Sequence, residues 1–236
     1  LYLLLHRLGI MGGNERSTLT RLIRPGMTVV DVGGNLGLYT VLFSRLVGPS
    51  GRVLSFEPDP NLFSQLLDNC SRNNCSNVNA VNLAVGRRRE HLNLQKLITN
   101  TGDNHLSNQE STFLRSSIRV GVVPLDEYIP VCRPNLIKID VQGWELEVMK
   151  GMENLLAEYP ETNIYFELWP RGLRRAGSST NEVFHWLKER GFRLYHAESQ
   201  TPLDDQALAK LVQNERSLKY FNIFATRTPF QWAQPN

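Results

Sequence analysis

The 236-residue sequence predicts an α/β fold built on a doubly wound, mostly parallel sheet. Short runs rich in β-branched residues alternate with segments in which apolar residues recur at helical spacing. Several of the runs are apolar throughout, as is typical of strands that are covered on both faces. With 41% hydrophobic residues the chain can bury one large core, so we expect a single domain over residues 1–236.

The first third of the chain is expected to hold three strands and two helices after a helical lead-in. The lead-in covers residues 1–26 and ends at a Pro-Gly turn. Each predicted strand is a short apolar run, and each predicted helix carries apolar residues on one face. The strands are predicted at 27–32, 52–57 and 78–86, and the helices at 35–47 and 61–74.

The helical period vanishes at residues 87–120, where polar loop residues dominate. We expect this stretch to be an insertion that covers the site and meets the substrate. The alternation then resumes, and a capping box at Ser179-x-x-Glu182 marks one helix start. The last predicted strand alternates more than the central ones do, which favours an edge of mixed orientation, and residues 227–236 form a tail. The later strands are predicted at 136–141, 163–168, 192–197 and 220–227, and the later helices at 144–156, 181–190 and 204–212.

Charge and cysteine content narrow the class of protein. The net charge is +3, and the arginine groups at 87–89 and 171–175 are expected in solvated loops, so no nucleic-acid partner is predicted. The three cysteines form no CxxC pair, which argues against a zinc site or a disulfide framework and favours a reducing, cytoplasmic location. The apolar opening LYLLLHRLGI is too short to span a bilayer.

Four acidic residues fall at or near the ends of predicted strands: Asp31, Glu57, Asp140 and Glu167. The carboxyl ends of parallel strands share one edge of a sheet, and ligands of such folds bind there. We therefore expect these four side chains along one rim.

A glycine-rich turn follows the first of these acids in the stretch VVDVGGNLG, with Gly33, Gly34 and Gly37 after Asp31. Glycines allow a sharp turn and a close approach of the backbone to a ligand. The dinucleotide fingerprint GxGxxG is absent, because counting from Gly33 places Asn35 at the second glycine position.

The second acid, Glu57, comes twenty residues after Gly37 and suits a ribose diol, because a carboxylate accepts hydrogen bonds from both hydroxyls. A carboxylate at this position could bind the ribose of NAD or of S-adenosylmethionine equally well. Asp31 separates the two, because it would repel a pyrophosphate but attract an ammonium and a sulfonium. The motifs favour S-adenosylmethionine, with a nicotinamide-dependent oxidoreductase or a non-catalytic binding domain as alternatives.

Four stretches carry a family resemblance. In this order, VVDVGGNLGLYT, RVLSFEPDP, VNLAVG and LIKIDVQGWELEVMKGM resemble the FkbM family of S-adenosylmethionine-dependent methyltransferases. The resemblance implies a Rossmann-like class I methyltransferase fold, with a mostly parallel seven-stranded sheet and helices on both faces. It also implies O-methylation of a hydroxyl on a small-molecule or glycan-type acceptor, such as a sugar, glycolipid or polyketide-type product. An N-methyltransferase of the same fold is the alternative.

The same resemblance assigns cofactor contacts by matching position. It implies Asp31, Gly33, Gly34, Asn35 and Gly37 at the methionine part, Glu57 at the ribose, Pro58 and Asp59 beside the adenosine, Asn82 and Ala84 at the adenine edge, and Asp140 on the same rim. One position departs from the family pattern, because Gln142 stands where relatives usually carry Glu.

Methyl transfer to a hydroxyl needs a group that accepts its proton. Asp140 is the candidate by position, and His105, in the insertion, is the candidate by chemistry, because imidazole titrates near neutral pH. Each has a structural alternative: Asp140 could cap the next helix or only hold the cofactor, and His105 could be a solvated loop residue. Asp140 and Glu167 are too few ligands for a metal ion, so no metal site is predicted. Trp144 is expected to pack into the sheet rather than stack on substrate.

Overall fold

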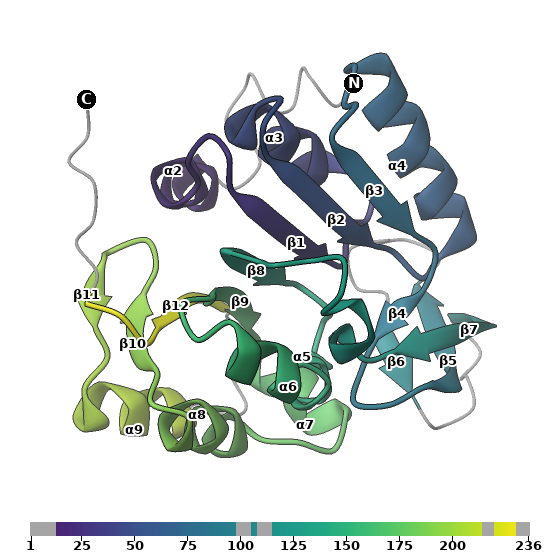
Figure 1. Cartoon of the computed structure of the whole chain (residues 1–236). Helices are drawn as coiled ribbons and strands as arrows, with labels where there is room; N and C mark the ends of the chain where they lie inside the picture. Colours follow the sequence, from purple (N-terminus) through teal and green to yellow (C-terminus); the bar gives the residue numbers. More distant parts are fainter. Residues whose placement is uncertain (1–12, 98–104, 108–114, 214–219, 230–236) are drawn as a thin grey trace.

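The computed structural model describes residues 13–97, 105–107, 115–213 and 220–229. Figure 1 shows a central sheet between two layers of helices, with a smaller sheet at one side, so the predicted α/β class is confirmed. The spatial order of the eight central strands is β11 (Thr201–Pro202), β10 (Arg193–His196), β12 (Phe221–Thr226), β9 (Asn163–Leu168), β8 (Leu136–Ile139), β1 (Thr28–Val32), β2 (Arg52–Phe56) and β3 (Val78–Val81).

The central sheet is parallel from β3 to β9 and antiparallel from β9 to β11. The predicted edge of mixed orientation is therefore confirmed. The expectation of seven strands is wrong by one, because residues 201–202 pair with β10 and add the short strand β11. A two-residue strand is too short to produce a periodic pattern in the sequence.

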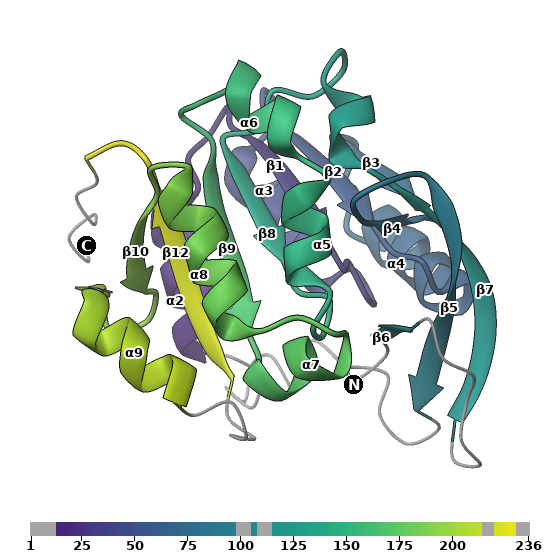
Figure 2. The same cartoon turned by 90° about the horizontal axis from the view of Figure 1, so that it is seen from below.

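Helices cover both faces of this sheet, as Figures 1 and 2 show from two directions. One face carries α2 (Gly13–Leu22), α3 (Leu38–Val47) and α4 (Pro60–Arg72). The other carries α5 (Glu145–Lys150), α6 (Glu153–Glu158) and α8 (Thr180–Glu189), with α9 (Asp205–Gln213) beside α8. Helix α7 (Pro170–Arg175) follows the end of β9.

The predicted helix at 144–156 is wrong in its continuity, because it divides into α5 and α6 at Gly151 and Met152. The backbone of Gly151 lies against that of Gly86, whose carbonyl oxygen would be 2.0 Å from a Cβ at position 151. Two backbones that meet this closely belong to distant parts of the chain, so the helical period gives no sign of the break.

Other boundaries also differ from the sequence expectations. The arginines at 171, 174 and 175 belong to α7 and not to a loop. Helix α3 begins at Leu38 and not at Asn35, because Asn35 and Gly37 have positive φ angles of 50° and 82°. Ser179 is confirmed as the N-cap of α8, since its Oγ accepts a hydrogen bond from the Glu182 backbone N–H at 3.2 Å, while the Glu182 side chain accepts from the Ser179 hydroxyl.

The smaller sheet is built from described residues between positions 84 and 123. Its four strands lie in the order β4 (Ala84–Val85), β7 (Arg115–Val123), β5 (Glu90–Leu97) and β6 (His105–Ser107), and the 3-10 helix η2 (Leu125–Tyr128) follows. The predicted strand at 78–86 is therefore two strands, β3 and β4, in different sheets. Leu94 and Val122 are buried in the same hydrophobic cluster as Phe56 and Ile139, so the small sheet packs on the central one.

The order of the central strands locates the ligand-binding edge. Strand β1 lies between β2 and β8, so the chain leaves β1 toward one side of the sheet and later returns on the other. In open α/β sheets, ligands bind at the carboxyl ends of the strands beside this reversal. None of the helices in the described ranges has the length and apolar character needed to cross a bilayer.

Candidate active site

The glycine-rich turn after β1 is held between β2 and the residue that follows β8. The backbone N–H groups of Gly33 and Gly34 both donate to the Phe56 carbonyl, at 3.0 and 2.9 Å. Gly33 has a φ of +88°, and a Cβ at this position would be 2.0 Å from the Asp140 carbonyl oxygen. Only glycine combines this conformation with this approach, so the turn brings the end of β1 directly against the end of β8.

Glu57 joins two loops at this edge. Its side chain is 5% exposed, and its two oxygens accept the backbone N–H groups of Asn35 at 2.7 Å and Asp59 at 2.8 Å. Burial raises the pKa of Glu57 to about 7, although these two hydrogen bonds act in the opposite direction. Each carboxylate oxygen keeps a further lone pair, so the side chain can still accept hydrogen bonds from a ligand.

The predicted adenosine contacts gather around Glu57. The Asn82 side-chain amide donates to the carbonyls of Glu57 at 2.8 Å and Pro58 at 3.2 Å. Asp59 caps α4 by accepting the Asn61 N–H, and it forms a 2.7 Å ion pair with Lys96 of β5. Ala84 is buried at the start of β4. The small sheet is therefore tied to the loop that follows β2.

Asp31 lies inside the sheet layer and not on the open rim. It is fully buried, and its Oδ2 accepts a 2.6 Å hydrogen bond from the Thr40 hydroxyl. Its Oδ1 has no hydrogen-bond partner within the described residues and lies 4.0 Å from the Lys138 Nζ. Because Asp31 offers no exposed surface here, its contact with the methionine part of a cofactor stays a prediction.

Lys138 is a site residue that the sequence analysis did not single out. It is 1% exposed, and its Nζ lies 3.2 Å from the Asp140 Oδ2 and 4.7 Å from the centre of the Tyr39 ring. Burial alone would lower the pKa of Lys138, but the charges of Asp140, Asp31 and Glu15 outweigh it and raise that pKa. A lysine inside the apolar run LIKI was the available signal.

Gln142 bridges two of the predicted rim acids. Its side-chain amide nitrogen donates to the Asp140 Oδ1 and to the Glu167 Oε1, both at 2.9 Å. Burial, together with the charge of Asp140, raises the pKa of Glu167 to about 8. The backbone carbonyl of Gln142 accepts a 3.0 Å hydrogen bond from Arg175, so α7 supports the bridge.

Glu145 stabilises the turn that carries this bridge. It is 1% exposed and accepts the Gly143 backbone N–H at 2.9 Å. Burial raises the pKa of Glu145 to about 7. The sequence analysis did not single out Glu145, because an acid in the first turn of a helix is usually exposed.

His105 begins β6 opposite Gln95, but its side chain lies outside the described residues. The structure therefore brings Asp140 and Glu167 together and leaves the role of His105 untested. In the described part of the chain, no three histidine, cysteine or acidic residues converge as metal ligands.

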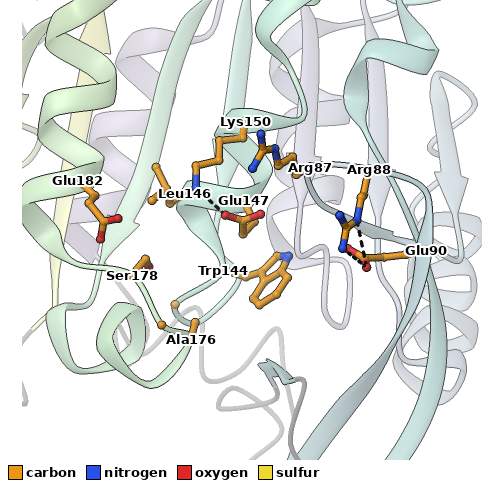
Figure 3. Close-up of a pocket in the computed structure, with 12 residues that line it drawn as sticks. Arg87, Arg88, Glu90, Trp144, Leu146, Glu147, Lys150, Ala176, Ser178 and Glu182 are labelled. Atoms are coloured by element: carbon orange, nitrogen blue, oxygen red, sulfur yellow. Dashed lines mark hydrogen bonds and ion pairs between the residues drawn. The ribbon is translucent and has the colours of Figure 1, made fainter.

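A cavity of about 500 Å³ opens beside the turn at Gly143 that precedes α5 (Figure 3). We call it the Trp144 cavity. Its walls come from the start of the small sheet, from α5 with the turn before it, and from the start of α8 with the loop before it. The lining residues are Arg87, Arg88, Glu90, Gly143, Trp144, Leu146, Glu147, Lys150, Ala176, Gly177, Ser178 and Glu182.

The chain is similar to known methyltransferases in sequence and in fold. The methyltransferase FkbM domain matches residues 31–194, more than half of the chain. Methyltransferase 1 of Beauveria bassiana is 29% identical over 146 residues, which cover 53% of this chain and 58% of that protein. Hexuronic acid methyltransferase AglP of Haloferax volcanii is 30% identical over 129 residues, which cover 53% of this chain and 50% of that protein. The chain thus spans between half and three fifths of these two relatives.

A solved structure shows the same fold. Methyltransferase FkbM from Methylobacillus flagellatus superimposes with a TM-score of 0.53 at 14% sequence identity, over 86% of this chain and 48% of that chain. At this identity the likeness supports the fold, while the match to the domain family rests on sequence.

Proposed function

Because the chain belongs to the FkbM family of methyltransferases, which use S-adenosylmethionine, we propose that it methylates a hydroxyl group on a sugar, glycolipid or polyketide-type product. The observation that carries this proposal is the pair of carboxylates, Asp140 and Glu167, bridged by Gln142 at the rim beside the glycine-rich turn. A hydroxyl acceptor needs a proton acceptor at this place, whereas an uncharged amine does not need one to attack.

The residues on the rim fit the proposed cofactor. Glu57 has lone pairs left for the two ribose hydroxyls, and the turn from Gly33 to Gly37 exposes backbone at the switch in strand order. When bound, S-adenosylmethionine supplies an electrophilic methyl group on a positively charged sulfur. The carboxylates of Asp140 and Glu167 favour that positive charge at the same rim.

Within the pair we assign the acceptor's proton to Glu167. Lys138 and Gln142 already hold both oxygens of Asp140, which makes Asp140 a positioning group. Glu167 forms no ion pair within the described residues. Its pKa of about 8 means that it binds a proton more readily than an ordinary glutamate. His105 is retained as the second candidate for this role.

The proposal has a direct test in the pH dependence of kcat with methyl β-glucoside or methyl β-glucuronide as acceptor. A base must be ionised, so the Glu167 assignment predicts a rate that rises through about pH 8. An imidazole base would place the rise near about pH 6.5. Glu167→Gln should lower kcat about 100-fold or more, with binding of S-adenosylhomocysteine unchanged.

The chemical structure of the methylated product identifies the acceptor atom. Mass spectrometry and NMR should find a methyl ether, whereas a methyl amine or a methyl ester would overturn the proposed hydroxyl transfer. A protein that binds S-adenosylhomocysteine but methylates none of a panel of sugars and polyols would support the non-catalytic alternative. His105→Gln serves as the companion variant, and it should keep the rise near pH 8.

The proposed function also includes a cellular location, a domain organisation and a class of acceptor. We propose a cytoplasmic enzyme in which residues 1–236 form one methyltransferase domain and residues 87–120 face the acceptor. We also propose that the acceptor is a small molecule or glycan rather than a nucleic acid. The sequence supports the last point, because outside the short arginine groups at 87–89 and 171–175 its basic residues are spread out and form no long stripe interleaved with aromatics. The ion pair between Lys96 and Asp59 supports a role for the insertion at the site.

A further inference from the structure

The Trp144 cavity reaches the turn that follows the bridging residue Gln142. Gly143, which lines the cavity, directly follows Gln142. The walls include Arg87 from the insertion and Ser178 from the loop before α8. A volume of about 500 Å³ lies within the usual range of small-molecule sites and exceeds the size of one sugar ring.

Two ion pairs account for four of the six charged side chains that line the cavity. Arg88 forms an ion pair with Glu90 at 3.3 Å, and Lys150 forms one with Glu147 at 2.8 Å. Arg87 has neither an ion pair nor a hydrogen-bond partner among the residues that the structure describes. Its guanidinium can therefore bind a carboxylate through two parallel hydrogen bonds.

The wall opposite Arg87 carries a negative charge, that of Glu182. Glu182 accepts a 2.8 Å hydrogen bond from the Ser179 hydroxyl, which leaves its negative charge in place. Figure 3 shows Glu182 on one side of Trp144 and the two arginines on the other. A ligand with one anionic group and several hydroxyls can place the anion at Arg87 and donate from a hydroxyl to Glu182.

Trp144 supplies a second sign of a missing ligand. It is 7% exposed, and its indole N–H has no acceptor within the described residues. Buried indole N–H groups usually find an acceptor. Figure 3 shows the nitrogen-bearing edge of the ring turned toward the arginines.

From these contacts we infer that the Trp144 cavity binds the acceptor, and that the acceptor carries a sugar ring with a carboxylate group. The carboxylate pairs with Arg87, a ring hydroxyl donates to Glu182, and an oxygen of the sugar accepts from the indole N–H of Trp144. This inference rests on the proposed function, since it identifies the substrate class of that site.

The test uses methyl β-glucuronide and its neutral counterpart, methyl β-glucoside, titrated by ligand-observed NMR into the full chain saturated with S-adenosylhomocysteine. Glucuronide should bind about fivefold or more tightly than glucoside. Arg87→Gln should abolish this preference, and Arg89→Gln should retain it. Arg89 is the matched control because it is the same residue type two positions away, paired with Glu127 and outside the cavity.

Three results would overturn the inference: equal binding of both sugars, equal effects of the two arginine variants, or displacement of glucuronide by an equal concentration of inorganic phosphate. The last would indicate a general anion site. Trp144→Phe should weaken both sugars to a similar degree, and if that variant fails to fold, the arginine pair still decides. Glucuronide binding that depends on Arg87 without any methyl transfer would refute the proposed function and keep the cavity assignment.

Discussion

Replacing the buried Lys138 with methionine should lower the free energy of unfolding by about 3–5 kcal/mol at pH 7.5. Lys138 is 1% exposed and lies 3.2 Å from Asp140 and 4.0 Å from Asp31. Methionine has a similar length and fills the same space, but it leaves two carboxylates without their counter-charge. Leaving a buried charge unpaired costs more free energy than the small change in packing between lysine and methionine.

The size of this effect should depend on pH. Burial already raises the pKa of Asp31 above its ordinary value of 3.8, and removal of Lys138 raises it further. A carboxyl whose pKa is higher in the folded state than in the unfolded state makes the free energy of unfolding pH-dependent. The protein loses stability as the pH rises from the unfolded pKa to the folded pKa. The destabilisation should therefore be largest at pH 7.5 and shrink as the pH falls toward 4.

Urea and thermal unfolding at pH 7.5 and pH 5 measure this prediction. For a chain of this length, the loss corresponds to a fall in Tm of about 6–20 °C. Lys188→Met is the control, because Lys188 pairs with Asp205 at the surface, with the two side chains 44% and 92% exposed. It should cost less than about 1 kcal/mol. A Lys138 variant that matches this control, or whose loss is the same at both pH values, would refute the reasoning.

Three further predictions concern the rim. Glu57→Gln should weaken S-adenosylhomocysteine binding about tenfold or more in calorimetry, and an unchanged affinity would remove the ribose assignment. The variant should also lower Tm, because an amide nitrogen cannot accept one of the two backbone N–H groups that the carboxylate holds. Gly33→Ala should lower Tm far more than Gly177→Ala: both have φ near +85°, at +88° and +85°, but a Cβ meets backbone at 2.0 Å only at position 33 and nothing within 4 Å at position 177. Equal losses would contradict the close approach. Gln142→Glu should destabilise the fold more at pH 8 than at pH 6, because it places a third carboxylate between two others; a loss independent of pH would count against the bridge.

Much of the rim could be predicted because it follows from local patterns. An apolar run that ends in an acid predicts both a buried strand and the position of the carboxylate, since parallel strands end at one edge. This reasoning placed Glu57, Asp140 and Glu167 correctly relative to the sheet. It placed Asp31 on the rim as well, whereas the structure turns its side chain toward Thr40 in the buried layer.

Two of the errors share one cause. The break between α5 and α6 and the division of 78–86 into two sheets depend on contacts between segments far apart in the chain. The extra strand β11 is a different case, because it pairs with the nearby β10 and is too short to produce a periodic pattern. The position of Lys138 also depends on a distant segment, because the register of β1 and β8 pairs Lys138 with Asp31. A residue's own neighbours in sequence carry no record of such partners.

The sequence by itself determined the α/β alternation, the glycine-rich turn and the order of acids at the strand ends, because each depends on the spacing of residues within one short segment. Only the tertiary structure decided that Gln142 joins Asp140 to Glu167, that Lys138 lies beside Asp140, and that Arg87 lines the Trp144 cavity without a partner among the described residues. These relations arise from register and packing between strands and helices, and they are the basis of our proposal that Glu167 takes the acceptor's proton.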